Sequence, residues 1–483
     1  MTAPMVAATP RSVDDLRGRR TVVLGLARSG LALARMLARA GARVTVYDRR
    51  GPDDLSDAVE ALRDTPVELA LAAPPDAVAS LLVGADLIFT SPSVSAHFAT
   101  TDEWLRQALA AAEASGTPVL SEVELFLRLT RARVVAVTGT KGKTTTAALI
   151  GAILESAEIP HVVGGNIGAP LVEQVESLTE RHWAVLELSE LQLPTISRGA
   201  DVAVYTNILE DHLDRHGSVE AYRAVKARLA ELAPAHGRVV LNADDDASLD
   251  LAMRLAARTN IHLYGLDPPP RTPGVAAWVG DGWLILGDVR RPDATERVIP
   301  AADVPLPGAH MLRDVLAASL AARLIGAEPS AIATAIRGFP GVPHRLEPVA
   351  DVAGVRYIND SQATIPVAAI AALRAYDAPI VVIAGGRGKG LDYAGLGDAI
   401  ADRCRAAVVM GETAPDIAAA IGGRVPVERA STMDEAVVAA QRMARPGDVV
   451  LLAPAAASFD AYVDYAARGD AFRGAVERLA TQR

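Results

Sequence analysis

The alternation of short apolar runs with helical patterns is the feature that most constrains the fold of this chain. "TVVLGL" (21–26) predicts a buried strand, "LALARMLARAG" has the apolar spacing of a helix, and "RVTVYD" (43–48) predicts a second strand. The same order begins again at "RVVAVTGT" (133–140) and once more after residue 350. Such alternation is typical of parallel sheets that are covered by helices. We therefore expect an α/β fold.

Changes in residue composition divide the alternating pattern into three blocks. The length of 483 residues suggests about three domains. After the second block, Asp-Gly at 281–282 predicts a hairpin between two β-rich runs. The stretch "GFPGVPHRLEPV" (338–349) is rich in Pro and Gly, which is typical of a boundary. We expect three α/β domains, over residues 1–130, 131–341 and 342–483.

Composition and charge argue against several classes of protein. The net charge of −10 and the pI near 5.5 argue against general nucleic-acid binding, which needs a basic face. The single cysteine, Cys404, rules out an internal disulfide and fits a reducing compartment. The N-terminus lacks the apolar stretch of a signal peptide, and no apolar run reaches the length of a membrane span. We expect a soluble cytoplasmic protein that does not insert into a membrane.

Lysine is rare in this chain, and two of its lysines lie in one loop. Only four of the 48 Lys and Arg residues are lysine: Lys141, Lys143, Lys226 and Lys389. The loop "VTGTKGKTTT" (137–146) follows a predicted strand and begins a predicted helix. Its backbone N–H groups favour an anion, Lys143 adds a compact charge for phosphate, and the Thr144 hydroxyl can reach Mg²⁺. The strict P-loop pattern fails at Val137, so an ordinary glycine-rich turn is the alternative.

A second glycine-rich turn follows the first predicted strand. "GLARSG" (25–30) resembles a dinucleotide-binding turn, with Ala27 in place of the middle glycine. Asp48 ends the next predicted strand, where it could bind a ribose. This pattern alone is weak, because many α/β domains have glycines at this point. An NAD-dependent oxidoreductase is therefore one alternative.

Polar clusters follow two further strands. Glu187 and Ser189 end the apolar run "AVLELS", where a carboxylate is costly unless it is paired or binds a metal. "TNILEDHLDRHGS" (206–218) places four polar side chains beyond another strand: Asp211, His212, Asp214 and His216. Because ligands of open α/β sheets bind at the carboxyl ends of strands, these clusters are expected to converge on the phosphate loop. A solvated polar loop is the alternative for each.

The order of motifs along the chain resembles that of the Mur ligases. The matching segments are "VTGTKGKTTT", "GGNIG" (164–168), "LELSELQL" (186–193), "TNILEDHLDRHGS", "PHRLE" (343–347), "NDSQAT" (359–364) and "PAAASFD" (454–460). The resemblance implies an N-terminal Rossmann-like domain for the UDP of a substrate and a central P-loop-type ATPase domain with a parallel sheet for ATP and Mg²⁺. It implies a C-terminal Rossmann-like domain for an amino acid. The first domain would then bind UDP rather than NAD.

The resemblance also implies an activity. ATP would phosphorylate the carboxylate of UDP-N-acetylmuramoyl-L-alanine, and the amine of D-glutamate would attack the acyl phosphate, in peptidoglycan precursor synthesis. Phosphorylation is needed because a carboxylate is a poor electrophile. Mg²⁺ and lysine would spread the charge of the transferring phosphoryl group. We expect a monomer.

Individual residues acquire roles from this resemblance. Catalysis would rest on Lys143, Glu187, His212 and Lys226. The nucleotide would be bound by Gly139, Thr140, Lys141, Gly142, Lys143, Thr144, Thr145, Arg345 and Asp360. Two Mg²⁺ ions would be held by Thr144, Glu187, His212 and a carbamylated Lys226. The two other substrates would be bound by Arg28, Ser29, Asp48, Arg49, Arg50, Asn166, Ser189, Gln192, Thr364, Lys389, Ser458 and Tyr465.

The chain departs from the family pattern at a few positions. Gln362 stands where the family usually has Lys, and Met311 and Asp314 stand where asparagines usually bind adenine. Glu190 replaces a usual Ser, and the role of Lys141 is open. Because of these differences, two alternatives to the implied activity stay open. One is a related ATP-dependent ligase with another acceptor, and the other is a nucleotide-binding chain without turnover.

Overall fold

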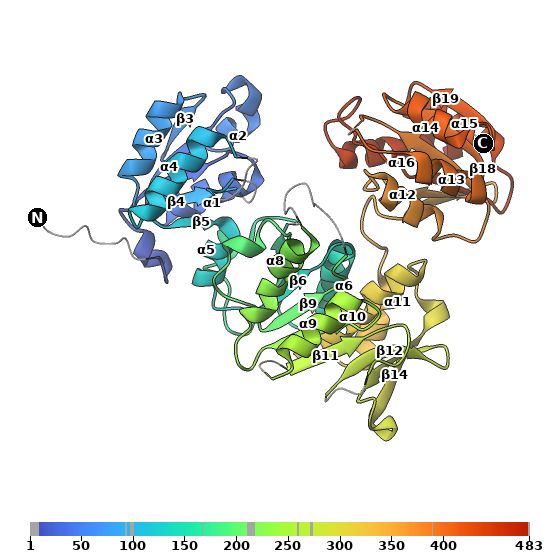
Figure 1. Ribbon diagram of the computed structural model, residues 1–483, viewed down its shortest axis with the longest axis horizontal. Helices are drawn as coiled ribbons and strands as arrows, with labels where there is room; N and C mark the ends of the chain where they lie inside the picture. The colour runs from blue at the N-terminus through green and yellow to red at the C-terminus, as the bar shows by residue number, and fades with distance from the viewer. Residues whose placement is uncertain are drawn as a thin grey trace, which may run out of the picture. The chain divides into compact units, whose positions relative to one another are not determined.

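The computed structural model describes residues 9–91, 94–96, 101–166, 168–209, 218–257, 260–270, 274–388 and 390–481. The chain forms two compact units: residues 1–303 with 313–337, and residues 304–312 with 338–483. Figure 1 shows the helices and strands of each unit. Within the described ranges, no helix combines the length and the apolar character that a membrane crossing requires.

The first sheet of unit 1 is parallel throughout, with the strand order β3-β2-β1-β4-β5. Its strands are β1 (Arg20–Leu24), β2 (Arg43–Asp48), β3 (Val67–Leu71), β4 (Leu87–Thr90) and β5 (Val119–Ser121). Its helices are α1 (Arg28–Arg39), α2 (Ser56–Glu60), α3 (Pro75–Gly84), α4 (Glu103–Ala114) and α5 (Glu122–Leu129). Alternate residues of β1 face α1 on one side and α3 with α4 on the other. The order of strands reverses between β1 and β4, which is where ligands bind in such sheets.

The second sheet of unit 1 has the order β14-β13-β12-β11-β10-β9-β6-β8-β7. Its strands are β6 (Arg133–Thr138), β7 (His161–Gly165), β8 (Trp183–Glu187), β9 (Val202–Tyr205), β10 (Arg238–Asn242), β11 (Asn260–Tyr264), β12 (Ala276–Gly280), β13 (Trp283–Gly287) and β14 (Thr295–Pro300). The strands from β7 to β12 are parallel, and β12, β13 and β14 are antiparallel. The hairpin predicted at 281–282 is confirmed, since Asp281 and Gly282 both have positive φ between β12 and β13.

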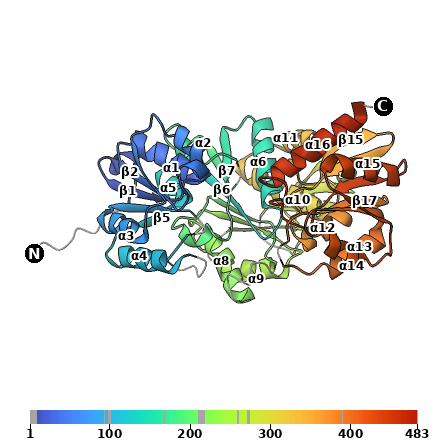
Figure 2. The ribbon, with the colours of Figure 1, turned by 90° about the horizontal axis from the view of Figure 1, so that it is seen from above.

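Helices cover both faces of this second sheet. They are α6 (Lys143–Ser156), α8 (Val219–Glu231), α9 (Asp246–Leu255), α10 (Ala309–Ile325) and α11 (Pro329–Gly338). Figure 2 shows α8 and α9 on the side of the sheet away from α6. Residues 134 and 136 of β6 share one apolar cluster with α8 and α9. The near-continuous apolar run of β6 is therefore buried on both faces, as parallel strands usually are.

The third sheet forms the centre of unit 2, with the order β15-β16-β20-β17-β18-β19. Its strands are β15 (Glu347–Val352), β16 (Val355–Asn359), β17 (Ile380–Gly385), β18 (Cys404–Met410), β19 (Val427–Ala430) and β20 (Val449–Leu452). Its helices are α12 (Pro366–Leu373), α13 (Ala394–Arg403), α14 (Ala414–Ile421), α15 (Met433–Met443) and α16 (Tyr465–Thr481). The helices α12, α13 and α14 pack on one face, and α15 and α16 pack on the other (Figure 2). Only the β15–β16 pair is antiparallel among the described strands of this sheet.

The α/β class expected from the sequence is confirmed by these three layered sheets. Each sheet lies within one of the three ranges expected as domains, although the first two sheets belong to one compact unit. The division between units passes through α10, so that Met311 belongs to unit 2 and Asp314 to unit 1. Met311 is buried in the apolar core of unit 2. The exact domain limits stay a prediction.

Candidate functional site

The loop between β6 and α6 is a compact turn that needs its glycines. Gly139 and Gly142 have φ angles of 147° and 88°, in a region that favours glycine. A Cβ at Gly139 would lie 1.9 Å from Thr206 Oγ1, and a Cβ at Gly142 would lie 2.1 Å from Asp314 Oδ1. The loop therefore has room for backbone only. The strand–turn–helix context predicted for "VTGTKGKTTT" is confirmed.

Lys143 begins α6 and folds back over this loop. Its Nζ donates to the carbonyl oxygens of Gly139 and Thr140, at 3.1 and 3.0 Å. The ammonium group therefore lies beside the loop amides rather than in open solvent. A phosphate at this point would meet a compact positive charge and the N-terminus of α6 together.

Three predicted ligand groups meet at the end of β8. Glu187 is 1% exposed and is the last residue of that strand. One oxygen of its carboxylate accepts from Thr144 Oγ1 at 2.8 Å, and the other accepts from Asn166 Nδ2 at 2.9 Å. The buried carboxylate is thus hydrogen-bonded by both flanking elements, which offsets the cost of its burial. The predicted convergence on the phosphate loop is confirmed for Glu187, which bonds Thr144, and Asn166 joins the same cluster.

Lys226 lies beneath the same loop. It projects from α8, is 0% exposed, and donates from Nζ to Gly139 O at 2.9 Å and Thr138 Oγ1 at 3.3 Å. The ring of Tyr222 lies 5.4 Å from Nζ, and the Tyr222 hydroxyl bonds Thr140 Oγ1 at 3.0 Å. Lys226 is therefore a buried lysine rather than a surface lysine of an amphipathic helix.

Residues after β9 support the loop from its outer side. Asn207 accepts from Lys141 N at 2.9 Å and donates to Lys141 O at 3.0 Å, so its amide clamps one peptide of the loop. Thr206 Oγ1 donates to the same Lys141 carbonyl. The motif beginning "TNI" predicted no role for these two side chains. The signal that could have found them is their place directly after a buried strand next to β6.

The remaining substrate residues of the second sheet lie just beyond β8. Ser189 donates from its backbone N and its Oγ to Gln192 Oε1, at 2.9 and 3.2 Å. Gln192 is buried, and Ser189 is partly exposed. The amide of Gln192 thus fixes the backbone turn that follows Glu187. Glu190, which replaces a usual Ser, is also buried in this turn.

The first sheet brings its predicted residues to its carboxyl edge. Gly25 begins the turn after β1, and a Cβ at Gly30 would lie 1.9 Å from Gly25 O, so α1 packs directly on the turn. Asp48 accepts from Leu26 N at 2.8 Å and from the backbone and guanidinium of Arg50. Burial raises the pKa of Asp48, but the hydrogen bonds from Arg50 and Leu26 outweigh it and lower that pKa to about 2. A firmly ionised carboxylate therefore holds the β2 end against the glycine turn.

Ser29 and Arg49 occupy the same edge of the first sheet. Ser29 lies in the first turn of α1, and Arg49 follows Asp48 directly at the end of β2. A separate cavity of about 780 Å³ opens at the amino edge of this sheet, and it is lined in part by Arg20, Arg43 and Glu68. Because ligands of parallel sheets bind at the carboxyl edge, we do not assign the substrate to this cavity.

Unit 2 has its own group of predicted residues. Arg345 lies between His344 and Leu346, which both have positive φ, so the backbone of "PHRLE" turns sharply there. Asp360 follows β16, is 6% exposed, and accepts from Leu346 N at 3.0 Å. Burial raises the pKa of Asp360 to about 6, while the Leu346 amide and Arg345 act to lower it. Arg345 and Asp360 therefore belong to one local structure.

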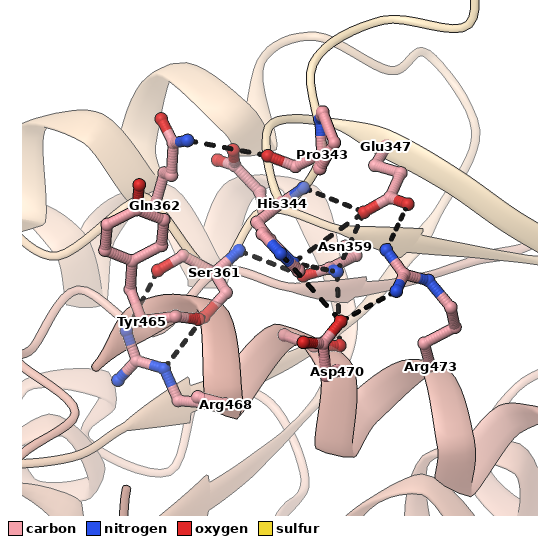
Figure 3. A network of polar contacts seen from close by, with 12 residues as sticks. Pro343, His344, Glu347, Asn359, Ser361, Gln362, Tyr465, Arg468, Asp470 and Arg473 are labelled. Carbon is pink, nitrogen blue, oxygen red and sulfur yellow. Dashed lines mark hydrogen bonds and ion pairs between the residues drawn. The ribbon is translucent and has the colours of Figure 1, made fainter. Parts of the chain in front are cut away.

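A buried polar network, shown in Figure 3, connects this turn to α16. Asn359 Nδ2 donates to Glu347 Oε2 at 3.0 Å and lies 3.1 Å from His344 Nδ1. Arg468, which is 2% exposed, donates to Ser361 Oγ at 3.0 Å and to Ser361 O at 2.9 Å. Sequence analysis missed His344 and Arg468. The signal for Arg468 is an arginine within an apolar helical pattern.

The amino-acid residues of the prediction are only partly described. Thr364 ends the "NDSQAT" segment, Ser458 is buried, and Tyr465 is 42% exposed at the start of α16, where its ring lies 6.2 Å from that of His344. Gln362 donates to Pro343 O at 3.5 Å (Figure 3). Several predicted residues lie outside the described residues: Asp211, His212, Asp214, His216 and Lys389. Within the described ranges, no group of three or more His, Cys, Asp or Glu side chains forms a metal site.

A glycine-rich loop between a buried parallel strand and a helix, with a lysine and a threonine at the helix start, defines a P-loop-type nucleotide-binding α/β protein. Two family models match the chain: the Mur ligase middle domain at residues 137–322 and the Mur ligase glutamate ligase domain at residues 344–456. The chain belongs to the Mur ligase family.

Relatives match over nearly the whole chain. The chain is 41% identical over 464 residues to the UDP-N-acetylmuramoylalanine--D-glutamate ligase of Acidobacterium capsulatum, with 96% of this chain and 97% of that protein covered. It is 39% identical over 465 residues to the ligase of the same name from Solibacter usitatus, with coverages of 96% and 99%. Among solved structures, UDP-N-acetylmuramate-alanine ligase MurC of Thermotoga maritima has a TM-score of 0.60 at 17% identity, with coverages of 96% and 100%. This last likeness supports the fold alone.

Proposed function

We propose that this chain is an ATP-dependent ligase that adds D-glutamate to UDP-N-acetylmuramoyl-L-alanine in peptidoglycan precursor synthesis. The relatives of that name match almost every residue range of the chain. The structural observation that carries the proposal is the cluster of Thr144, Asn166 and Glu187. It lies beside a loop whose Gly139 carbonyl accepts from the ammonium groups of Lys143 and Lys226. A phosphoryl-transfer site needs this combination of fixed positive charge and hard oxygen ligands.

The residues present fit a nucleotide and a metal ion. Gly139 and Gly142 shape a tight turn that admits no side chain, and Lys143 and Thr144 follow it directly at the start of α6. Thr144 Oγ1 and both oxygens of Glu187 lie within one hydrogen-bonded cluster, and oxygen is the ligand that Mg²⁺ prefers. We propose that Thr144 and Glu187 hold Mg²⁺ with ATP, and that Arg345 and Asp360 contact the nucleotide. Bound Mg²⁺ would supply charge stabilisation for the transferring phosphoryl group.

The protein's own part in the reaction is positioning and charge. An oxygen of the L-alanine carboxylate attacks the γ-phosphorus of ATP, ADP departs, and an acyl phosphate forms. The amine of D-glutamate then attacks the acyl carbon, loses a proton, and inorganic phosphate departs as the amide forms. Lys143 would stabilise the charge on the phosphoryl oxygens as a point charge. Asn166, Ser189 and Gln192 would orient the acceptor next to it.

Finer assignments are part of the same proposal. His212 and a carbamylated Lys226 would hold a second Mg²⁺ ion, and Thr364, Lys389, Ser458 and Tyr465 would bind D-glutamate. Arg28, Ser29, Asp48, Arg49 and Arg50 would bind the UDP group at the carboxyl edge of the first sheet. Residues 1–130, 131–341 and 342–483 would act as the UDP, ATP and amino-acid domains of a monomer.

The experiment is phosphate release from ATP with UDP-N-acetylmuramoyl-L-alanine and a panel of D- and L-amino acids. We expect release with D-glutamate, at a rate far above that with any other member of the panel. Equal use of D-alanine would instead identify a related ligase with another acceptor. Binding of ATP without release under any condition would identify a nucleotide-binding protein without turnover.

A further inference from the structure

The segment 164–174 joins the first sheet of unit 1 to the phosphate loop. At one end, the backbone N of Asn166 donates to Glu187 O at 2.9 Å, and its side chain donates to the Glu187 carboxylate. At the other end, Arg39 of α1 donates to Glu173 O at 3.2 Å and lies 3.7 Å from Glu173 Oε1. The segment therefore contacts β8 on one side and α1 on the other.

Arg28 connects the same segment to the predicted UDP site. It is the first residue of α1, and one of its terminal nitrogens donates to Asn166 O at 3.3 Å. The two arginines at the ends of α1 thus both bind the segment 164–174. A guanidinium group has five N–H donors, so Arg28 can bind Asn166 and a substrate phosphate at once.

Glu122 is the buried carboxylate at this junction. It is the first residue of α5, is 5% exposed, and its Oε1 accepts from Val172 N at 3.1 Å. Its surroundings are apolar, since α1, α5, Leu171 and Val172 share one buried cluster. Burial raises the pKa of Glu122 to about 7, while the Val172 amide and the nearby positive charge of Arg28 act to lower it. Neither the loop chemistry nor the predicted ligand sets use this residue.

The proposal concerns how substrate binding is organised in unit 1. We propose that Glu122 is a positioning residue that holds Arg28 and the segment 164–174 in the geometry that binds the diphosphate of the UDP substrate. The inference rests on the proposed function for the identity of the substrate. Glu122 itself touches no reacting atom.

The charged groups around Glu122 limit what its titration can affect. Arg28 of α1 is the nearby positive charge that acts to lower the pKa of Glu122, whereas Arg39 and Glu173 pair with each other at the far end of the segment. Glu124, on the same helix, bonds Arg128 and Ser197 instead. An ionised Glu122 therefore acts mainly on Arg28. It is ionised above about pH 7 and neutral below.

The test compares Glu122→Gln with Glu124→Gln. Glutamine at 122 keeps an oxygen that can accept from Val172 N but removes the charge that restrains Arg28. We expect KM for UDP-N-acetylmuramoyl-L-alanine to rise about tenfold, as when an outer residue that orients a ligand group is lost, with kcat and KM for ATP within about twofold of the parent. Glu124→Gln removes an equally buried carboxylate two residues away, and it should leave all three constants near the parent's.

A pH profile gives a readout that a merely structural role would not change. In the parent, kcat/KM for the UDP substrate should rise as pH passes through about 7, because the ionised carboxylate restrains Arg28. The substrate's diphosphate is esterified at both ends, so it does not titrate there. Glu122→Gln should lose this inflection. The parent profile needs no variant, so the test stands even where the substitution impairs folding.

Two results would overturn the inference. One is an unchanged KM and an unchanged pH profile in folded Glu122→Gln. The other is full additivity of Glu122→Gln with Arg28→Gln, because a residue that acts through Arg28 has little left to do once Arg28 is gone. Calorimetric binding of the UDP substrate without ATP separates this outcome from a failure of the proposed ligase activity. Tight binding by the parent that weakens in Glu122→Gln supports the inference even if no amide forms.

Discussion

The Gly139 carbonyl oxygen accepts hydrogen bonds from two ammonium groups, those of Lys143 and Lys226. Two of the four lysines in the chain therefore meet at one backbone atom, one from each side of the loop. Lysine presents a compact charge on a flexible stem, whereas arginine presents a planar fork. Because Gly139 packs closely against Thr206 and Asn207, the compact ammonium group fits at this carbonyl better than the fork. The retention of lysine at these positions in an arginine-rich chain is thus a geometric requirement.

At Lys143, the charge can be tested apart from the fold. Lys143→Ala should abolish phosphate release with little loss of stability. The loop is held by its glycines and by hydrogen bonds between the Asn207 side chain and the Lys141 backbone. Lys143→Arg should also lose most activity, since its fork does not reproduce the point charge. Thermal unfolding measured beside phosphate release checks both statements. Near-parent turnover of either variant would remove Lys143 from the site.

Substitutions of Lys226 distinguish two roles for its side chain: a carbamate that binds a metal ion, and an ammonium group that only supports the loop. Lys226→Ala should lose most activity, and acetate or formate should restore part of it if a carbamate oxygen binds the second metal ion. Lys226→Arg should stay inactive under both conditions, because the buried position has no room for the larger group. Activity that acetate fails to restore, together with a lowered midpoint of thermal unfolding, would indicate that Lys226 only supports Gly139 from below.

The strand–loop–helix unit of β6 and α6 depends on glycine at a position where no side chain fits. Gly142 stands immediately before α6, with φ at 88°, directly against Asp314. Asp314 replaces an asparagine of the family pattern, and it lies where a Cβ at 142 would point. The helix start, the loop amides and α10 are therefore assembled around one glycine.

Gly142→Ala should be far more damaging than a glycine substitution with similar φ elsewhere. Gly282 has φ at 76° and open space around it, so Gly282→Ala measures left-handed strain alone, about 1–2 kcal/mol. Gly142→Ala adds a clash with Asp314 Oδ1, so its free energy of unfolding should fall further and phosphate release should be lost. Urea unfolding of the two variants checks the order. Equal destabilisation would show that Asp314 moves aside freely.

At the scale of the whole molecule, two buried carboxylates respond to pH in opposite directions. The pKa of Asp48 in unit 1 lies near 2, so its contribution to stability is present above its ordinary value of 3.8 and is lost as pH falls through about 2. The pKa of Asp360 in unit 2 is raised to about 6. Its contribution is present below 3.8 and is lost as pH rises through about 6. At neutral pH, the buried and ionised carboxylate of Asp360 therefore lowers the stability of unit 2.

Asp360→Asn should stabilise the fold while it harms nucleotide use. Asparagine can still accept from Leu346 N, but it has no charge to bury. The gain in free energy of unfolding over the parent should be near zero at pH 4 and should grow to about 3 kcal/mol above pH 6. Urea unfolding at several pH values checks this, with Asp402→Asn, at an exposed position of α13, as the control for net charge. A gain that does not vary with pH would contradict the assignment.

Local patterns in the sequence predicted much of this protein. The apolar runs at 133–138 and 183–187 became β6 and β8, and Asp281–Gly282 formed its hairpin, because period, length and turn chemistry are properties of neighbouring residues. The glycine loop with Lys143 and Thr144 lies within one strand–helix unit, so its geometry also follows from local sequence. The strand-end rule for parallel sheets extended this to Glu187. The family motifs added the proposed substrates.

Only the tertiary structure brought together residues that are distant in the chain. Glu122 meets Val172 across 50 positions, and Arg468 meets Ser361 across 107. Neither pair has a local pattern, since each depends on how segments that are distant in the chain pack together. The burial of Lys226 under Gly139 has the same cause, because an amphipathic helix does not specify which of its polar residues lies beneath a neighbouring loop. Strands, turns and the loop follow from short-range sequence, whereas the buried charges that position the site follow from packing.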